Sequence, residues 1–107
     1  MVGNQRQMLQ QVQQIQRQMQ KIQEALGSET VEGSAGGAVT ITITGHLKVT
    51  NVQVDPEAVD PQDVSLLEEM LVTAINDAIS KAQDLAAKRL EPLTGGLKGL
   101  GLPPGLL

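Results

Sequence analysis

Residues 5–26 constrain the fold of this chain more than any other stretch. Its apolar residues recur at alternating spacings of four and three positions, and they are Met8, Val12, Ile15, Met19, Ile22 and Leu26. This two-in-seven seam predicts a helix, from near Asn4 to Gly27, that packs along a narrow stripe against other helices. Most other positions are Gln, a good helix former without charge.

This helix requires a partner. Burying six medium-sized apolar side chains contributes roughly 10–15 kcal/mol, whereas ordering some twenty residues costs about 1–2 kcal/mol each. The partner comes either from later in the chain or from a second copy. We therefore expect the six seam residues to lie in the core or in a dimer contact.

A small antiparallel sheet is predicted after this helix. Residues 29–32 are a short polar strand candidate, and residues 39–44 alternate strictly between apolar residues and threonines. Gly45 and His46 predict a tight turn into a third strand over residues 47–54. The apolar residues of that strand switch from one face to the other midway. A bulge at Thr50 and Asn51 would return them all to the core side.

A second long helix is predicted from Asp60 to about Leu90. Asp60 suits the N-cap and Pro61 the first helical position, whereas Glu91 and Pro92 predict the end of the helix. Its apolar face is wide enough to touch more than one neighbour. The order helix, strands, helix predicts an α+β fold with both helices on one side of the sheet and their outer ends projecting past it.

The composition limits what this chain can do. Its 107 residues suit one domain, which we assign to residues 1–92, and the Gly/Leu/Pro-rich residues 93–107 are expected to form a flexible tail. The absence of Phe, Tyr and Trp predicts a thin core and favours a homo-oligomer. No apolar run is long enough for a membrane span and no export signal is visible, so a cytoplasmic location is expected.

Motifs for catalysis or metal binding are weak. The chain has no Cys, its one histidine, His46, falls in a predicted turn, and the GSAGG stretch lacks the residues of a phosphate loop. Strand termination and helix capping explain most of the acids at 55, 57, 60 and 63 better than a calcium site does. We expect no enzyme activity, no cofactor, no metal and no small-molecule substrate; for His46, a phosphate contact beside Lys48 is the alternative to no role.

Charge is distributed unevenly along the chain. The net charge is −4, yet residues 55–77 hold seven acids and no base, whereas residues 1–26 and 78–90 each carry +2. The expected topology therefore places basic side chains on the projecting helix ends. The basic side chains of these two regions are Arg6, Arg17, Lys21, Lys81, Lys88 and Arg89.

Several features of this chain occur together in the same order and spacing. They are the Gln- and Met-rich first helix, the strand closing on Gly45, the segments VQVDP at 52–56 and AINDA at 74–78, and LPPG at 102–105. In this combination nearly the whole chain resembles the YbaB/EbfC family of bacterial nucleoid-associated proteins. The resemblance implies an α-β-β-β-α subunit, a tweezer-like homodimer, and binding of double-stranded DNA in the nucleoid with little sequence preference. This chain lacks aromatic residues and is acidic overall, and no family motif maps DNA contacts residue by residue.

Two functions remain open from the sequence. The first is a homodimeric, nucleoid-associated DNA-binding protein that influences nucleoid organisation and gene expression. Its candidate DNA contacts are the six basic residues Arg6, Arg17, Lys21, Lys81, Lys88 and Arg89. The second is a protein-interaction or prefoldin-like chaperone module without DNA binding, in which the seam of the first helix holds a partner helix. A salt-titrated DNA-binding assay separates the two.

Overall fold

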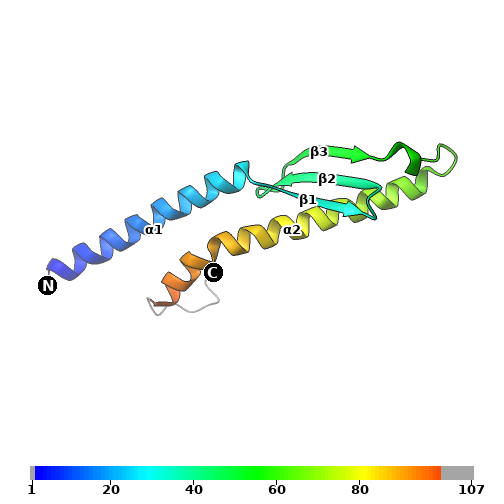
Figure 1. The fold of residues 1–107 in the computed structure, drawn as a ribbon. Coiled ribbons are helices and arrows are strands. Elements are labelled where there is room, and N and C mark those ends of the chain that lie inside the picture. The colour runs from blue at the N-terminus through cyan, green and yellow to red at the C-terminus, as the bar shows by residue number, and fades with distance from the viewer. Residues whose placement is uncertain (1, 100–107) are drawn as a thin grey trace.

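The computed structural model describes the backbone of residues 2–99 and the side chains of residues 5–93. The element order is α1 (Val2–Ser28), β1 (Thr30–Ala35), β2 (Val39–Thr44), β3 (Val49–Val54), the short 3₁₀ helix η1 (Pro56–Ala58) and α2 (Val64–Gly99). The strands form one antiparallel sheet in the order β1-β2-β3 (Figure 1). The α-β-β-β-α expectation for the subunit is confirmed.

The core lies between β2 and α2. Val39, Ile41 and Ile43 alternate along β2 with threonines, so all three reach the same face of the sheet, where they are buried. They meet three buried alanines of α2, spaced four residues apart, which are Ala74, Ala78 and Ala82. Small residues at this spacing form a flat stripe along the helix, which allows the sheet to approach closely.

Gly33 brings β1 and α2 into direct backbone contact. It pairs with Ile41 on the core face of the sheet. A Cβ atom at this position would lie 2.2 Å from the backbone nitrogen of Ala78 and 2.5 Å from the carbonyl oxygen of Ala74. Only glycine fits there, and the three stripe alanines and Gly33 together replace the bulky aromatic packing that this chain lacks.

The third strand is an edge strand whose apolar face α2 does not cover. The predicted bulge is confirmed: Thr42 pairs with Asn51 and Ile43 with Val49, so Thr50 is the extra residue. Val49 and Val52 therefore face the same side as the core, yet 44% and 47% of their surfaces remain exposed. Because α2 packs mainly on β1 and β2, these two side chains stay about half exposed within one subunit.

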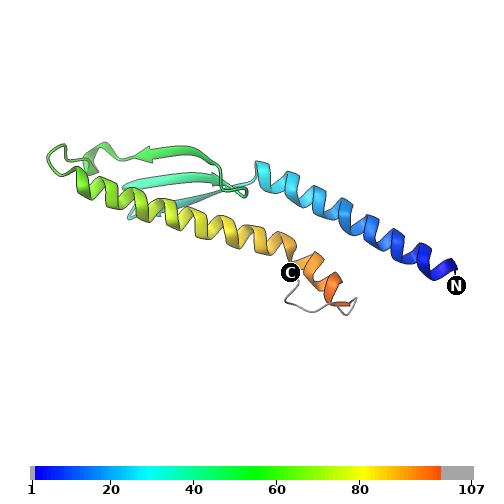
Figure 2. The same cartoon turned by 180° about the vertical axis from the view of Figure 1, so that it is seen from behind.

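The helix α1 does not lie on the sheet, contrary to the sequence-based expectation. Both views show it leaving the end of the sheet, while α2 alone covers one face (Figures 1 and 2). The reason is the connection, because Glu29 is the only residue between the end of α1 and the start of β1. One residue is too short to reverse the chain, so α1 projects and the molecule extends over 75 Å.

The boundaries of α2 differ from the prediction at both ends. It begins at Val64, because residues 60–63 form a turn in which the backbone N–H of Asp63 donates to the carbonyl oxygen of Asp60. It then continues through Pro92 to Gly99, although proline removes one helical hydrogen bond and crowds the carbonyl four residues earlier. Leu93 directly afterwards is buried, which offsets part of that cost. Figure 1 shows the axis of α2 bending toward this end.

The predicted ends of α1 and of the third strand also shift. The first helix runs from Val2 to Ser28, so Gly27 lies inside it. The third strand begins at Val49 because Leu47 adopts a left-handed backbone conformation, with φ 64°, and closes the turn. The expected flexible tail begins within α2, whose helix continues to Gly99; its remainder, residues 100–107, lies outside the described residues, and the division at residue 92 stays a prediction.

Candidate nucleic-acid interface

The projecting helix α1 carries its three basic side chains on one side. Because an α-helix turns about 100° per residue, Arg6, Arg17 and Lys21 fall within about 60° of one another around its axis. All three are exposed, and among the described residues none forms an ion pair. Glu24 shares their side near the sheet and is the one acid of this helix. The result is a long, weakly charged surface with a positive bias.

The apolar seam occupies the opposite side of α1. Leu26 is buried, and Ile15 and Ile22 are half-buried. In contrast, Met8 is 67% exposed, and Val12 and Met19 are also exposed. The seam is therefore covered only toward the sheet, and its role as a dimer or core contact stays a prediction. Two open apolar surfaces result: the outer seam of α1 and the uncovered face of β3.

The three basic residues of α2 differ in their surroundings. Lys88 is exposed and has no ion pair among the described residues. The Lys81 ammonium lies 3.2 Å from a carboxylate oxygen of Asp77, one helical turn earlier. Arg89 binds Glu29 with two parallel hydrogen bonds, one from Nε to Oε2 at 3.0 Å and one from Nη2 to Oε1. Lys81 and Arg89 thus already hold acidic partners.

These pairs shift the protonation of their members. The pKa of Asp77 is lowered, first because its carboxylate accepts a hydrogen bond of 3.0 Å from the backbone N–H of Ser34, and second because Lys81 is adjacent. The hydrogen bonds and charge of Glu29 raise the pKa of Arg89. Asp77 thereby joins α2 to β1 through Ser34, and Arg89 joins α2 to the connection between α1 and β1.

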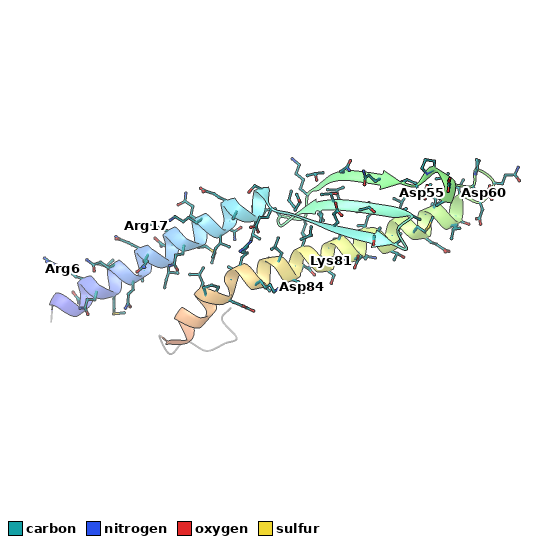
Figure 3. The ribbon with its side chains drawn as sticks, in the orientation of Figure 1. Arg6, Arg17, Asp55, Asp60, Lys81 and Asp84 are labelled. Atoms are coloured by element: carbon teal, nitrogen blue, oxygen red, sulfur yellow. The ribbon has the colours of Figure 1, made fainter. Side chains whose placement is uncertain are left out.

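Arg6 and Arg17 lie far from Asp55 and Asp60 along the length of the molecule. Figure 3 shows Arg6 and Arg17 on the projecting helix and Asp55 and Asp60 at the opposite end, beyond the sheet. Each of these two acids has a local structural task, since the Asp55 carboxylate accepts from the backbone N–H of Glu57 and that of Asp60 from Gln62. Asp55 and Asp60 thus each hold a local turn of the backbone.

The structure also places the other residues that the sequence brought into question. The His46 ring lies 3.1 Å from the amide oxygen of Gln23, which places it at the base of α1. Within the described residues no group of three His, Cys, Asp or Glu side chains is arranged to hold a metal. An open hollow beside β2 and β3 is lined by Gly37, Ala38, Thr40, Gln53, Val54 and Asp55, which offer no pairing of a nucleophile with a base. Over residues 2–99, neither helix is apolar enough along its length to cross a membrane.

The chain belongs to the YbaB/EbfC DNA-binding family, whose sequence model matches residues 2–97. It is 57% identical over 98 residues to a nucleoid-associated protein of Chloroflexus aurantiacus, covering 91% of this chain and 98% of the relative. It is 47% identical over 95 residues to a nucleoid-associated protein of Roseiflexus castenholzii, covering 89% and 95%.

A solved structure shares the fold. The crystal structure of an uncharacterised protein from Helicobacter pylori matches with a TM-score of 0.61 at 17% identity, over 72% of this chain and 82% of that one. The family resemblance seen in the sequence is therefore confirmed by the family match and by the close relatives.

Sequence reasoning missed the acidic partners of the basic residues. The pairing of Asp77 with Lys81 has a local signal, because residues four apart face each other on a helix. The pairing of Glu29 with Arg89 has none, since the two residues are 60 positions apart. Only the fold, which brings the end of α1 beside the second half of α2, reveals it.

Proposed function

We propose that this protein binds double-stranded DNA as a homodimer with little sequence preference, on the nucleoid in the cytoplasm and without catalysis. Its family and its nucleoid-associated relatives support the class of function. The observation that carries the proposal for this chain is the exposed basic side of α1, formed by Arg6, Arg17 and Lys21 and projecting clear of the acidic end. Phosphates need only such positive groups, without a base-reading helix.

The proposed contacts differ in whether the basic side chain is already paired with a carboxylate. Arg6, Arg17, Lys21 and Lys88 have no carboxylate partner within the described part of the chain. Lys81 and Arg89 would have to exchange a carboxylate for a phosphate. We therefore assign the main phosphate contacts to the first four residues.

The DNA-binding test is a salt titration on a random-sequence duplex. Each neutralised phosphate contributes about −0.9 to the slope of log K against log salt concentration, so a dimer that makes four to six contacts gives a slope of roughly −4 to −5. The double variant Arg17→Gln/Lys21→Gln should flatten this slope, while Lys48→Gln in the β2–β3 turn should not. No binding at ~50 mM salt would refute the proposal, and a copurifying protein partner would then favour the interaction-module alternative.

The homodimer is proposed to bury the two apolar surfaces that one subunit leaves open. On β3 this surface includes Val49 and Val52, and on α1 it includes Val12 and Met19. The edge strand itself holds no charged residue over Val49–Val54, although uncovered edges usually carry charges that prevent pairing. A second copy would remove this exposed apolar surface from water.

Sedimentation equilibrium tests the dimer and its surfaces. Val52→Asp and Val12→Asp should each shift the protein toward the monomer, because a charge would enter a buried contact. Val72→Asp is the matched control, since Val72 is at least as exposed but lies on α2 away from both surfaces. A wild-type protein that sediments as a monomer at micromolar concentration would refute the dimer.

A further inference from the structure

We propose that Glu29 and Arg89 are positioning residues that fix the direction in which α1 leaves the sheet, and with it the placement of the basic side chains offered to DNA. The inference deepens the proposed function and rests on it for its effect on DNA. It assigns Arg89 a different role from a phosphate contact. The argument depends on how α1 is attached, on the geometry of the pair, and on the length of the helix that the pair controls.

The contacts that hold α1 gather at its last turns. The Gln23 amide meets the His46 ring, and the backbone N–H of Gly45 donates to the carbonyl oxygen of Glu29 at 3.1 Å. Leu26 is buried against Gly45, where a Cβ atom would lie 2.8 Å from the leucine side chain. Farther out, Met8 is largely exposed. Within one subunit, α1 is thus held mainly toward its base.

The Glu29–Arg89 pair joins the C-terminal end of α1 to α2. Glu29 lies between α1 and β1, and Arg89 lies in the second half of α2. Two parallel hydrogen bonds join the guanidinium to both carboxylate oxygens. Such a fork fixes the plane of both groups, which a single contact from lysine cannot do. The pair therefore restrains the angle between α1 and α2 and not only the distance between them.

The length of α1 makes this restraint matter. Both side chains are partly exposed, so the pair contributes little to overall stability. At 1.5 Å per residue, the 27 residues of α1 extend about 40 Å, and a 10° change at the base moves the far end by roughly 7 Å. That is about twice the 3.4 Å rise between phosphates along one strand of B-DNA. A weak interaction at the base can thus place Arg6 on or off a phosphate.

The positioning role and the contact role predict opposite results for one substitution. Glu29→Gln removes a negative charge and releases Arg89. If Arg89 binds phosphate directly, the variant should bind DNA more tightly. If the pair positions α1, the variant should bind more weakly, even though it carries one negative charge fewer.

The first experiment measures DNA affinity in a double-mutant cycle. We expect Glu29→Gln and Arg89→Gln each to weaken binding at least threefold, and the double variant to be no weaker than Arg89→Gln alone. Glu32→Gln, which removes an acid from β1 without breaking a described ion pair, is the matched control and should not weaken binding. Tighter or unchanged binding by Glu29→Gln, or additive losses in the cycle, would overturn the proposal.

The second experiment reads the geometry without DNA. The chain has no cysteine, so spin labels can be placed uniquely at the exposed positions of Gln10 on α1 and Gln83 on α2. Doubly labelled protein is refolded with excess unlabelled protein, so that each dimer holds at most one labelled chain. We expect the distance distribution to broaden or shift in Glu29→Gln and Arg89→Gln but not in Glu32→Gln.

Identical distributions in all variants would overturn the positioning role. If the wild-type protein fails to bind DNA but the distance distribution changes in Glu29→Gln, the proposed function is refuted. The role of the pair in positioning α1 then still holds. The two failures are therefore distinguishable.

Discussion

At the scale of single residues, Gly33 has the closest backbone neighbours of the glycines that the structure describes. Its α-carbon faces the backbone of α2 at Ala74 and Ala78, and no flexible side chain lies between them. Even one added methyl group would have to push the helix away from β1. The same argument explains why alanines, and not larger apolar residues, line the buried stripe of α2.

Gly33→Ala should therefore destabilise the protein by about 3 kcal/mol, at the upper end of the usual cost of overpacking. Urea unfolding followed by circular dichroism measures this loss. Gly27→Ala is the control, because a Cβ atom there would meet only the His46 ring, at 3.4 Å. Equal stability of the two variants would contradict the close approach of α2 to β1.

Asp77 gives the stability a specific pH dependence. Its lowered pKa means that the folded protein binds this proton less readily than the unfolded chain, whose Asp77 has the ordinary pKa of 3.8. The resulting stability is present above that value and is lost as the pH falls through the lower folded pKa.

The Asp77→Asn variant should consequently be less stable than the wild type near pH 5. This difference in the free energy of unfolding should become smaller as the pH falls to below 3.8. Denaturant unfolding at a series of pH values tests this. Asp84→Asn removes one acidic charge from the same helix without breaking a described ion pair and serves as the control. A difference in the free energy of unfolding that grows toward low pH would contradict the conclusion that Ser34 and Lys81 lower the pKa of Asp77.

At the scale of elements, the sequence predicted β2 better than the other elements. The first strand, expected over residues 29–32, runs from Thr30 to Ala35. Strict alternation located β2 exactly, and the switch of apolar residues between faces located the bulge at Thr50. The predicted start and end of α2 were wrong because both were inferred from proline. Pro61 belongs to a turn, and Pro92 is tolerated inside the helix. Local patterns record what a residue prefers, whereas the burial of Leu93 beyond Pro92 is a tertiary effect.

The candidate site was predictable only in part for the same reason. Helical periodicity suffices to place the three basic residues of α1 on one side. It cannot show that α1 projects from the sheet, because this follows from the single-residue connection at Glu29. Nor can it show that Arg89 is already paired, since its partner is distant in the chain.

Pro92→Ala should strengthen the last turns of α2. Proline inside a helix costs about 3 kcal/mol relative to alanine, and this cost is local to the segment that follows. We expect slower amide hydrogen exchange over residues 93–99 and little change in the global unfolding midpoint. Unchanged exchange over those residues would show that proline does not limit this end of the helix.

At the scale of the whole molecule, the arrangement of charge matters more than its sum. A net charge of −4 suggests repulsion from DNA. Yet the molecule extends over 75 Å, whereas electrostatic interactions are screened within about 8 Å at physiological salt. The acidic end around Asp55 and Asp60 is therefore too far from the projecting α1 to oppose its binding.

Two variants with the same change in net charge should then differ in affinity. Glu68→Gln/Glu69→Gln, near the acidic end, removes two negative charges and should alter the dissociation constant for duplex DNA less than twofold at 0.15 M salt. Gln10→Lys/Gln14→Lys adds two positive charges to α1 and should tighten binding at least fivefold. Equal gains would mean that the net charge, and not its placement, governs binding.

The contact between Gly33 and α2 also has a mechanical consequence. Where a helix rests on a sheet through long side chains, a sideways load is partly absorbed as those side chains change rotamer. Here backbone meets backbone without such a cushion, and tightly packed interiors are nearly incompressible. A tilt of α2 near Ala74 and Ala78 must therefore move β1 with it, so that this part of the helix and the sheet behave as one rigid unit.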